Sequence, residues 1–231
     1  MIDAIIFDKD GTLFDFRASW GAWTTSLLAE LAPDASRARE LGEILGFDPD
    51  TRNFAKGSPV ISHTTPEIAA LLHPHLTGIS LLALNDRMSA LSAAAPMVPA
   101  VPLRPVLAAL KARGLTLGLA TNDTELPART HLDRAGVLDL FDFVAGCDSG
   151  WGGKPAPGQL LAFLDRFGLT AARSAMVGDS RHDLDAGRAA GMHSVAVLTG
   201  IASAAELAPH ADVVLADISG LGRWIDGLQT A

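Results

Sequence analysis

Cysteine, positive charge and long apolar runs are all scarce in this chain of 231 residues. Cys147 is the only cysteine, so no disulfide can form within the chain, and the sequence lacks the pattern of a secreted disulfide scaffold. A formal net charge of −8 disfavours a protein that binds nucleic acid through a basic face. An anionic small molecule stays possible, because a local site can oppose the overall sign.

Signals for insertion into a membrane are also missing. The apolar run that ends at Phe7 is short and contains Asp3, unlike a secretory leader. Apolar stretches such as residues 79–84 are far below the length that spans a bilayer. We therefore expect a cytoplasmic protein without a membrane partner.

Three familiar motifs for nucleotides and metals are absent. No Gly-x-Gly-x-x-Gly opens a helix after the first apolar run, so dinucleotide binding has no support. Lys154 is followed by Pro155, where a P-loop requires Ser or Thr. The acidic run that starts at Asp8 has glycine at its fourth position, whereas a calcium loop needs it at the sixth.

What the chain does contain is an alternation of short apolar runs with amphipathic segments. Its 48% hydrophobic and 19% charged residues are typical of a folded globular protein. Near-continuous apolar runs separated by amphipathic stretches of about ten residues predict a parallel sheet covered on both faces. We therefore predict an α/β fold, a Rossmann-like parallel sheet of six strands with helices on both faces. The predicted strands are 4–7, 115–121, 141–146, 175–179, 194–198 and 212–215, and the helices are 104–113, 124–135, 157–167, 184–190 and 218–228.

Residues 16–100 interrupt this alternation. They contain no convincing strand, and Thr65-Pro66-Glu67 is typical of a helix start, with a capping hydroxyl and proline at the first helical position. Four prolines between positions 96 and 105 then form a stiff connector. The predicted helices here are 19–31, 35–45, 65–72 and 81–94. We expect a catalytic core of residues 1–15 and 101–231, with a small all-helical cap of residues 16–100 inserted after the first strand.

Polar side chains gather where the predicted strands end. They are Asp8 and Asp10 after the first strand, Thr121 and Asn122 after the second, Lys154 in the loop after the third, and Asp179 and Asp183 after the fourth. Ligands of open α/β sheets bind at the carboxyl ends of the strands, so these groups are expected to share one rim. Gly11 and Thr12 predict a turn that brings the first two acids to one mouth.

This set of side chains suits phosphoryl transfer. Crowded carboxylates repel one another and lose solvation, so they persist mainly where a cation or a chemical task holds them. Asp8, Asp10 and Asp179 would hold a hard cation such as Mg²⁺ through oxygens. Lys154 and the Thr121 hydroxyl would bind phosphoryl oxygens.

Each residue alone also has an ordinary structural interpretation. Thr121 can cap the helix expected near Thr124, and Lys154 can be a solvated loop lysine. Asp179 and Asp183 can interact with a helix N-terminus. Their joint occurrence at successive strand ends favours a site.

These residues resemble the four motifs of the haloacid dehalogenase-like hydrolase superfamily. The run from Asp8 to Thr12 looks like the first motif, Thr121 the second, Lys154-Pro155-x-Pro157 the third, and Gly178-Asp179-Ser180-x-x-Asp183 the fourth. The match covers the whole predicted core, and residues 16–100 resemble the helical cap of that family. The chain is most similar to phosphoglycolate phosphatase-like members, through Gly146-x-Asp148-Ser149 and Gly187-x-x-Ala190-Gly191.

The resemblance implies a magnesium-dependent phosphatase of small phosphomonoesters, such as phosphoglycolate or a sugar phosphate. Asp8 would be the nucleophile that forms an aspartyl-phosphate. Asp10 would be the general acid for the leaving alkoxide and then the base for the hydrolytic water. An acid at this second position favours phosphate esters, because dehalogenase and phosphonate-hydrolase branches generally lack it.

The resemblance also implies a ligand set. Mg²⁺ would be held by the Asp8 side chain, the Asp10 backbone carbonyl and Asp179. Asp183 would lie in the second shell or bind the ion through water. Phosphate would be gripped by Thr121, the amide of Asn122 and Lys154.

Substrate specificity is expected to come from the cap. Arg17, Arg52 and Lys56 are the candidate residues, with His63 as a further possibility. Trp20 and Trp23 also belong to the candidates, but tryptophans at helical spacing more often belong to a core.

Two other functions fit parts of the pattern. A sugar phosphomutase shares the four motifs but returns the phosphate to a sugar, and a phosphorylation-state sensor combines acids, a hydroxyl and a lysine around one aspartate. The chain is longer than such a sensor needs. We expect a small phosphorylated metabolite as the partner, no nucleic acid, and a monomer or homodimer.

Overall fold

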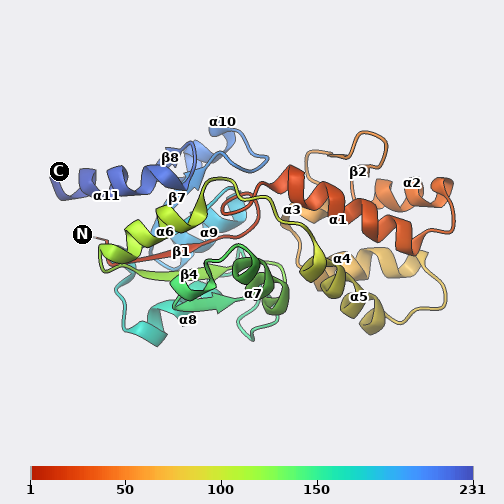
Figure 1. The fold of residues 1–231 in the computed structure, drawn as a ribbon, viewed down its shortest axis with the longest axis horizontal. Helices are drawn as coiled ribbons and strands as arrows, with labels where there is room; N and C mark the ends of the chain where they lie inside the picture. The colour runs from red at the N-terminus through yellow and green to blue at the C-terminus, as the bar shows by residue number, and fades with distance from the viewer. Residues whose placement is uncertain (1, 231) are drawn as a thin grey trace.

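The computed structural model describes residues 2–230, and a six-stranded sheet forms the centre of the part that carries both chain ends (Figure 1). The strands are β1 (Ala4–Phe7), β4 (Thr116–Ala120), β5 (Phe143–Ala145), β6 (Ser174–Gly178), β7 (His193–Val197) and β8 (Val213–Leu215). Their order is β5-β4-β1-β6-β7-β8, and every neighbouring pair is parallel. The predicted fold class is therefore confirmed, and β1 lies between β4 and β6.

Helices cover both faces of the sheet because successive side chains of each strand point to opposite sides. In β1, Ile5 and Phe7 belong to a cluster with helices α6 (Leu103–Ala112), α7 (Glu125–Arg134) and α11 (Leu221–Thr230). Ala4 and Ile6 belong to another cluster with α8 (Gly158–Phe167) and α9 (Arg181–Ala189). Both faces of the central strand are thus buried, which is why its sequence is uniformly apolar.

Helix α9 begins earlier than the predicted start at residue 184. Its N-cap is Ser180, and Asp183 completes a capping box with it. This cap places Asp183 in the first turn of the helix, directly beside the end of β6. The carboxylate is thereby fixed at the edge of the sheet where the candidate site lies.

Residues 16–95 gather around an apolar cluster of their own, at the end of the molecule opposite the two chain ends (Figure 1). The helices are α1 (Phe16–Leu31), α2 (Ala35–Ile44), α3 (Pro59–Ser62), α4 (Thr65–Leu72) and α5 (Leu81–Ala94). Their buried side chains include Trp23, Leu27, Leu41, Leu72 and Met88. The segment has enough apolar surface to form its own packed unit.

This segment is not entirely helical, contrary to the expectation for residues 16–100. A short antiparallel hairpin joins β2 (Phe47–Asp48) to β3 (Asn53–Phe54). The Asp48 carboxylate accepts hydrogen bonds from the following turn, and the Phe47 and Phe54 rings pack with centroids 4.9 Å apart. Strands of two residues are too short to produce an alternating pattern, so they cannot be predicted from the sequence.

The remaining elements are short. They are α10 (Ala204–Leu207) and the 3₁₀ turns η1 (His73–His75), η2 (Leu138–Leu140), η3 (Ala171–Arg173), η4 (Ala208–His210) and η5 (Ile218–Gly220). Within residues 2–230, no helix combines the length and the apolar character needed to cross a bilayer.

Candidate active site

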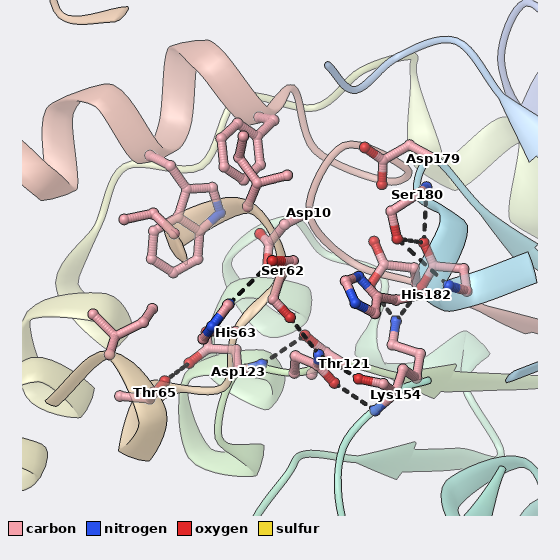
Figure 2. Close-up of a pocket in the computed structure, with 18 of the residues that line it drawn as sticks. Asp10, Ser62, His63, Thr65, Thr121, Asp123, Lys154, Asp179, Ser180 and His182 are labelled. Atoms are coloured by element: carbon pink, nitrogen blue, oxygen red, sulfur yellow. Dashed lines mark hydrogen bonds and ion pairs between the residues drawn. The ribbon is translucent and has the colours of Figure 1, made fainter. Parts of the chain in front are cut away.

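The seven core residues singled out from the sequence all line one pocket at the carboxyl ends of β1, β4 and β6 (Figure 2). They are Asp8, Asp10, Thr121, Asn122, Lys154, Asp179 and Asp183. The register of the strands brings these residues together. Phe7 of β1 pairs with Leu119 of β4 on one side and with Val177 of β6 on the other, so the three strands end at the same level. Residues far apart in the chain therefore face a common space.

Lys154 lies between two carboxylates. Its Nζ donates to Asp8 Oδ1 and to Asp183 Oδ1, each at 2.6 Å, and the side chain is buried. Burial would lower the pKa of Lys154, but Asp183 and Asp8 outweigh that effect and raise it. The Asn122 side chain holds the backbone of the lysine, accepting from its N–H at 2.7 Å and donating to its carbonyl at 3.0 Å. The ammonium is charged and fixed.

Three buried acids crowd beside this ammonium. Asp8, Asp179 and Asp183 each offer an oxygen, and these atoms lie within 4.8 Å of one another. Burial is the main cause that raises the pKa of Asp8 to about 7 and that of Asp179 well above its usual range, and Asp183 raises both further. Three carboxylates against one lysine leave negative charge that a divalent cation would balance, and carboxylate oxygens are ligands that Mg²⁺ prefers. The residues present fit such an ion.

Two glycines let Asp179 approach. A Cβ atom at Gly11 would lie 2.4 Å from Asp179 Oδ2, and one at Gly200 would lie 1.6 Å from the same atom. Gly11 also has φ of 87°, a conformation that favours glycine. The glycine of the first motif is therefore required both by its own backbone and by the carboxylate of the fourth motif.

Thr121 and Asn122 connect the site to its surroundings. Thr121 does not cap α7, whose N-cap is Thr124; its Oγ1 instead accepts from the N–H of Asp123 at 3.1 Å. Asn122 Nδ2 donates to the carbonyl of Ser62, in α3, at 2.9 Å. Asn122 thus links the loop that carries Lys154 to the helical segment.

A second charged cluster lies beside the first, and the sequence analysis did not single it out. Lys9 is fully buried, and its Nζ lies 3.1 Å from Asp10 Oδ2, 2.9 Å from Asp123 Oδ2 and 3.0 Å from His131 Nδ1. We call Lys9, Asp10, Asp123 and His131 the Lys9 cluster. Its one sequence signal is a lysine between two acids directly after a buried strand.

The helical segment forms the opposite wall of the pocket. The wall is largely apolar, with polar side chains at its edge; it consists of Phe16, Trp20, Trp23, Val60, Ile61 and Ile68, with Ser62, His63 and Thr65. Trp20 and Trp23 pack edge to face with ring centroids 4.8 Å apart and also belong to the apolar cluster of this segment. Among the described residues, neither indole N–H makes a well-formed hydrogen bond, although that of Trp20 lies close enough to Asp10 to oppose the rise in the pKa of this acid that burial causes. Both tryptophans therefore serve core and pocket at once.

The three residues expected to set specificity do not line the pocket as described. Arg17, Arg52 and Lys56 are all exposed. Lys56 forms an ion pair with Glu206, and its side chain is 87% exposed. The hydrogen bond from Lys56, together with hydrogen bonds from Ser203, lowers the pKa of Glu206 to about 2. His63 and His182 instead reach the pocket, from the helical segment and from α9 (Figure 2).

Fold and site together define an α/β protein with a phosphoryl-transfer type of site, in which acids from several strand ends surround one lysine. Residues 2–191 match the family model of the haloacid dehalogenase-like hydrolases, and the chain belongs to that family. The predicted family membership is confirmed.

Relatives of known name agree with this assignment. A phosphoglycolate phosphatase from Rhodospirillum rubrum is 31% identical over 97% of this chain and 91% of its own length. A phosphoglycolate phosphatase from Neisseria gonorrhoeae is also 31% identical, over 86% of this chain and 81% of its own.

Solved structures show the same fold. CbbY from Rhodobacter sphaeroides, in complex with phosphate, aligns with a TM-score of 0.71 at 23% identity, over 96% of this chain and 97% of its own. A β-phosphoglucomutase from Clostridium difficile aligns with a TM-score of 0.68 at 20% identity, over 98% and 96%.

Proposed function

We propose that this protein is a magnesium-dependent phosphatase that hydrolyses small phosphomonoesters through an aspartyl-phosphate. The observation that carries the proposal is the geometry around Asp8, which accepts from Lys154 at 2.6 Å and shares a 4.8 Å cluster with two more acids. A carboxylate placed beside a fixed cation and a site for a divalent ion is arranged to meet a phosphoryl group. The names of the curated relatives support phosphoglycolate or a similar small ester as substrate.

In the proposed reaction, an Asp8 oxygen forms a bond to phosphorus while the ester P–O bond breaks and its electron pair stays on the leaving oxygen. Asp10 gives its proton to that oxygen. Asp10 then takes a proton from the water that attacks phosphorus, and the Asp8–phosphorus bond breaks. Lys154 and Thr121 hold the phosphoryl oxygens throughout.

Mg²⁺ would be held by the Asp8 side chain, the Asp10 backbone carbonyl and Asp179, and when bound it would neutralise charge on the phosphoryl group. Asp183 would serve from the second shell, because it already holds Lys154 through one oxygen. Its other oxygen accepts from the N–H and Oγ of Ser180 at 3.0 and 2.6 Å. Asp183 is thus fixed in place by two different groups.

We further propose that residues 16–100 act as a cap that excludes water and contacts the leaving group. The apolar wall around Trp20 and Trp23 supports this role, as does the bond from Asn122 to Ser62. His63 and His182 are the ionisable side chains best placed to meet a polar leaving group. A small metabolite therefore suits the site better than a macromolecule.

The test is hydrolysis of a generic aryl phosphate in the presence of Mg²⁺, followed by a panel that includes phosphoglycolate and sugar phosphates. Asp8→Asn keeps the shape of the side chain but removes the nucleophile, so we expect turnover to fall by about 10³-fold or more. The thermal unfolding midpoint of the variant serves as the folding control. Undiminished turnover in a folded variant would contradict the nucleophile assignment. A stable phosphoenzyme that needs a bisphosphate activator would identify a mutase instead.

A further inference from the structure

The proposed reaction gives no task to the buried ammonium of Lys9. Lys9 is 0% exposed, although it belongs to the same motif as both acids of the mechanism. Its ammonium contacts Asp10, Asp123 and His131. A buried ammonium is costly unless it is fully paired, so this arrangement calls for an explanation.

The partners of Lys9 are themselves fixed. Asp123 Oδ2 accepts from Ser92 Oγ at 2.9 Å and Asp123 Oδ1 accepts from the N–H of Thr124 at 2.8 Å. Burial would raise the pKa of Asp123, but Lys9 outweighs it and lowers the pKa. The Lys9 cluster therefore has little freedom to rearrange.

The cluster also joins the two parts of the molecule. Ser92 is in α5, and its carbonyl lies 2.7 Å from His131 Nε2 of α7. The Lys9 ammonium lies 5.3 Å from the centre of the Trp20 ring, within the range of a cation–π contact. Two helices of the proposed cap, α1 and α5, therefore help to fix one ammonium of the core.

The two oxygens of the Asp10 carboxyl group indicate a role for the fixed Lys9 ammonium. Its Oδ2 is held by Lys9 at 3.1 Å, whereas its Oδ1 is buried with no well-formed hydrogen bond among the described residues. Burial raises the pKa of this carboxyl group, and Lys9 and the Trp20 indole N–H oppose the rise. Asp10 also lines the pocket. One oxygen of this carboxyl group is anchored while the other is left for a group inside the pocket.

We propose that Lys9 is a positioning residue, which orients the Asp10 carboxyl group toward the leaving-group oxygen and is itself anchored to the cap through Asp123, His131 and Ser92. The inference rests on the proposed phosphatase function. In the step concerned, the P–O bond breaks, the leaving oxygen keeps the electron pair, and the proton on Asp10 moves to that oxygen. Lys9 neither gains nor loses a proton.

The experiment compares alkyl and aryl phosphates, because an aryl leaving group needs little protonation and an alkyl one needs it fully. We expect Lys9→Met to lower kcat for an alkyl phosphate about tenfold more than for an aryl phosphate, which is part of the effect that general acids contribute. KM should change little for either ester. Lys111→Met is the matched control, because Lys111 pairs with Asp142 at 2.7 Å on the surface, and its alkyl-to-aryl ratio should equal that of the wild type.

A double-variant cycle separates positioning from general damage. In an Asp10→Asn background, Lys9→Met should cause no further change in the alkyl-to-aryl ratio, since the residue through which it acts is gone. A merely structural role would reduce the active fraction and lower both rates equally. Equal losses on both esters, or full additivity with Asp10→Asn, would overturn the inference.

Ser92→Ala keeps the test informative should Lys9→Met fail to fold. This variant removes only the 2.9 Å bond to Asp123, and we expect the ratio to fall severalfold in a folded protein. An unchanged ratio would overturn the inference. Failure of the proposed function itself would appear separately, as full activity in Asp8→Asn.

Discussion

The two buried lysines of this protein lie in adjoining clusters, yet their surroundings differ in kind. Lys154 and Lys9 each contact two carboxylates at 3.1 Å or less, and both are 5% exposed or less. The acids around Lys154 face a pocket and include a third carboxylate, Asp179. Asp123, beside Lys9, instead receives hydrogen bonds from the protein. Both clusters reach the pocket, but the Lys154 cluster presents three carboxylates to it, whereas Asp123 of the Lys9 cluster is satisfied by the protein.

The direction of the pKa shifts expresses the same difference. Burial raises the pKa of Asp8 to about 7, because its single lysine is shared with Asp183. For Asp123, Lys9 and several hydrogen bonds outweigh burial and lower the pKa. Burial also raises the pKa of Asp10, so the Lys9 cluster is not fully compensated either, but three crowded carboxylates lie beside Lys154 and only two beside Lys9. Variants of the two lysines should therefore fail in different ways.

Among the lysine variants, the largest effect on activity is expected from Lys154→Met. Loss of a fixed cation beside the phosphoryl oxygens should lower kcat for an aryl phosphate by about 10²–10³-fold, the usual result of removing one donor to developing charge. The measurement is initial rate at saturating substrate, with Lys111→Met as the control. The unfolding free energy of Lys154→Met should also depend more steeply on Mg²⁺ concentration than that of the wild type, because Asp8 and Asp183 lose their counter-ion. Activity within threefold of the wild type would refute the role given to this lysine.

Lys9→Met should lower stability in addition to its effect on the alkyl-to-aryl ratio. Removal of one partner from a buried ion pair typically costs about 3–5 kcal/mol, because the remaining charge is left uncompensated. We expect the free energy of unfolding, measured by urea denaturation, to fall by about that amount, while surface variant Lys111→Met changes it by about 1 kcal/mol or less. Adding Asp123→Asn should restore part of the loss. A Lys9→Met protein as stable as the wild type would mean that the two clusters do not differ as described.

These differences show where sequence reasoning succeeds. The sheet was predictable because each strand carries its own local apolar signal, and the positions of Asp8, Thr121, Lys154 and Asp179 follow because parallel strands end at one edge. The Lys9 cluster was not predictable, since His131 is an ordinary helical residue until folding brings it to Lys9.

The cap marks the other limit. Arg17, Arg52 and Lys56 were singled out by charge, but charge says nothing about which side of a helix or loop faces a pocket. Trp20 and Trp23 are candidates for the pocket whose helical spacing favours the core, and the structure places them in the core and in the pocket wall together. Which side chains of the helical segment face the pocket depends on tertiary contacts, and these cannot be predicted from a local sequence pattern.

The Lys9 cluster also predicts that the stability of the protein depends on pH. Burial, reinforced by Lys9, lowers the pKa of His131 from 6.5 to about 4. The unfolded state therefore binds more protons between these values, so the stability from His131 is complete above pH 6.5 and is lost as pH falls toward 4. The loss should reach about 3 kcal/mol. His131→Gln keeps one donor and one acceptor, and its unfolding free energy should fall less steeply over this range. Identical pH profiles for both proteins would contradict the assignment.

The smallest effect is expected from a third lysine, Lys56, which is exposed, unlike the buried Lys154 and Lys9. Lys56 is 87% exposed and pairs with Glu206 across the surface between the helical segment and the core. Water and salt screen such a pair, so Lys56→Ala should leave the urea midpoint and kcat/KM within experimental scatter of the wild type. An unchanged midpoint with a raised KM would have a different meaning. It would show that the cap takes a second position, in which Lys56 leaves Glu206 and contacts the substrate, and so restore this lysine to the residues that set specificity.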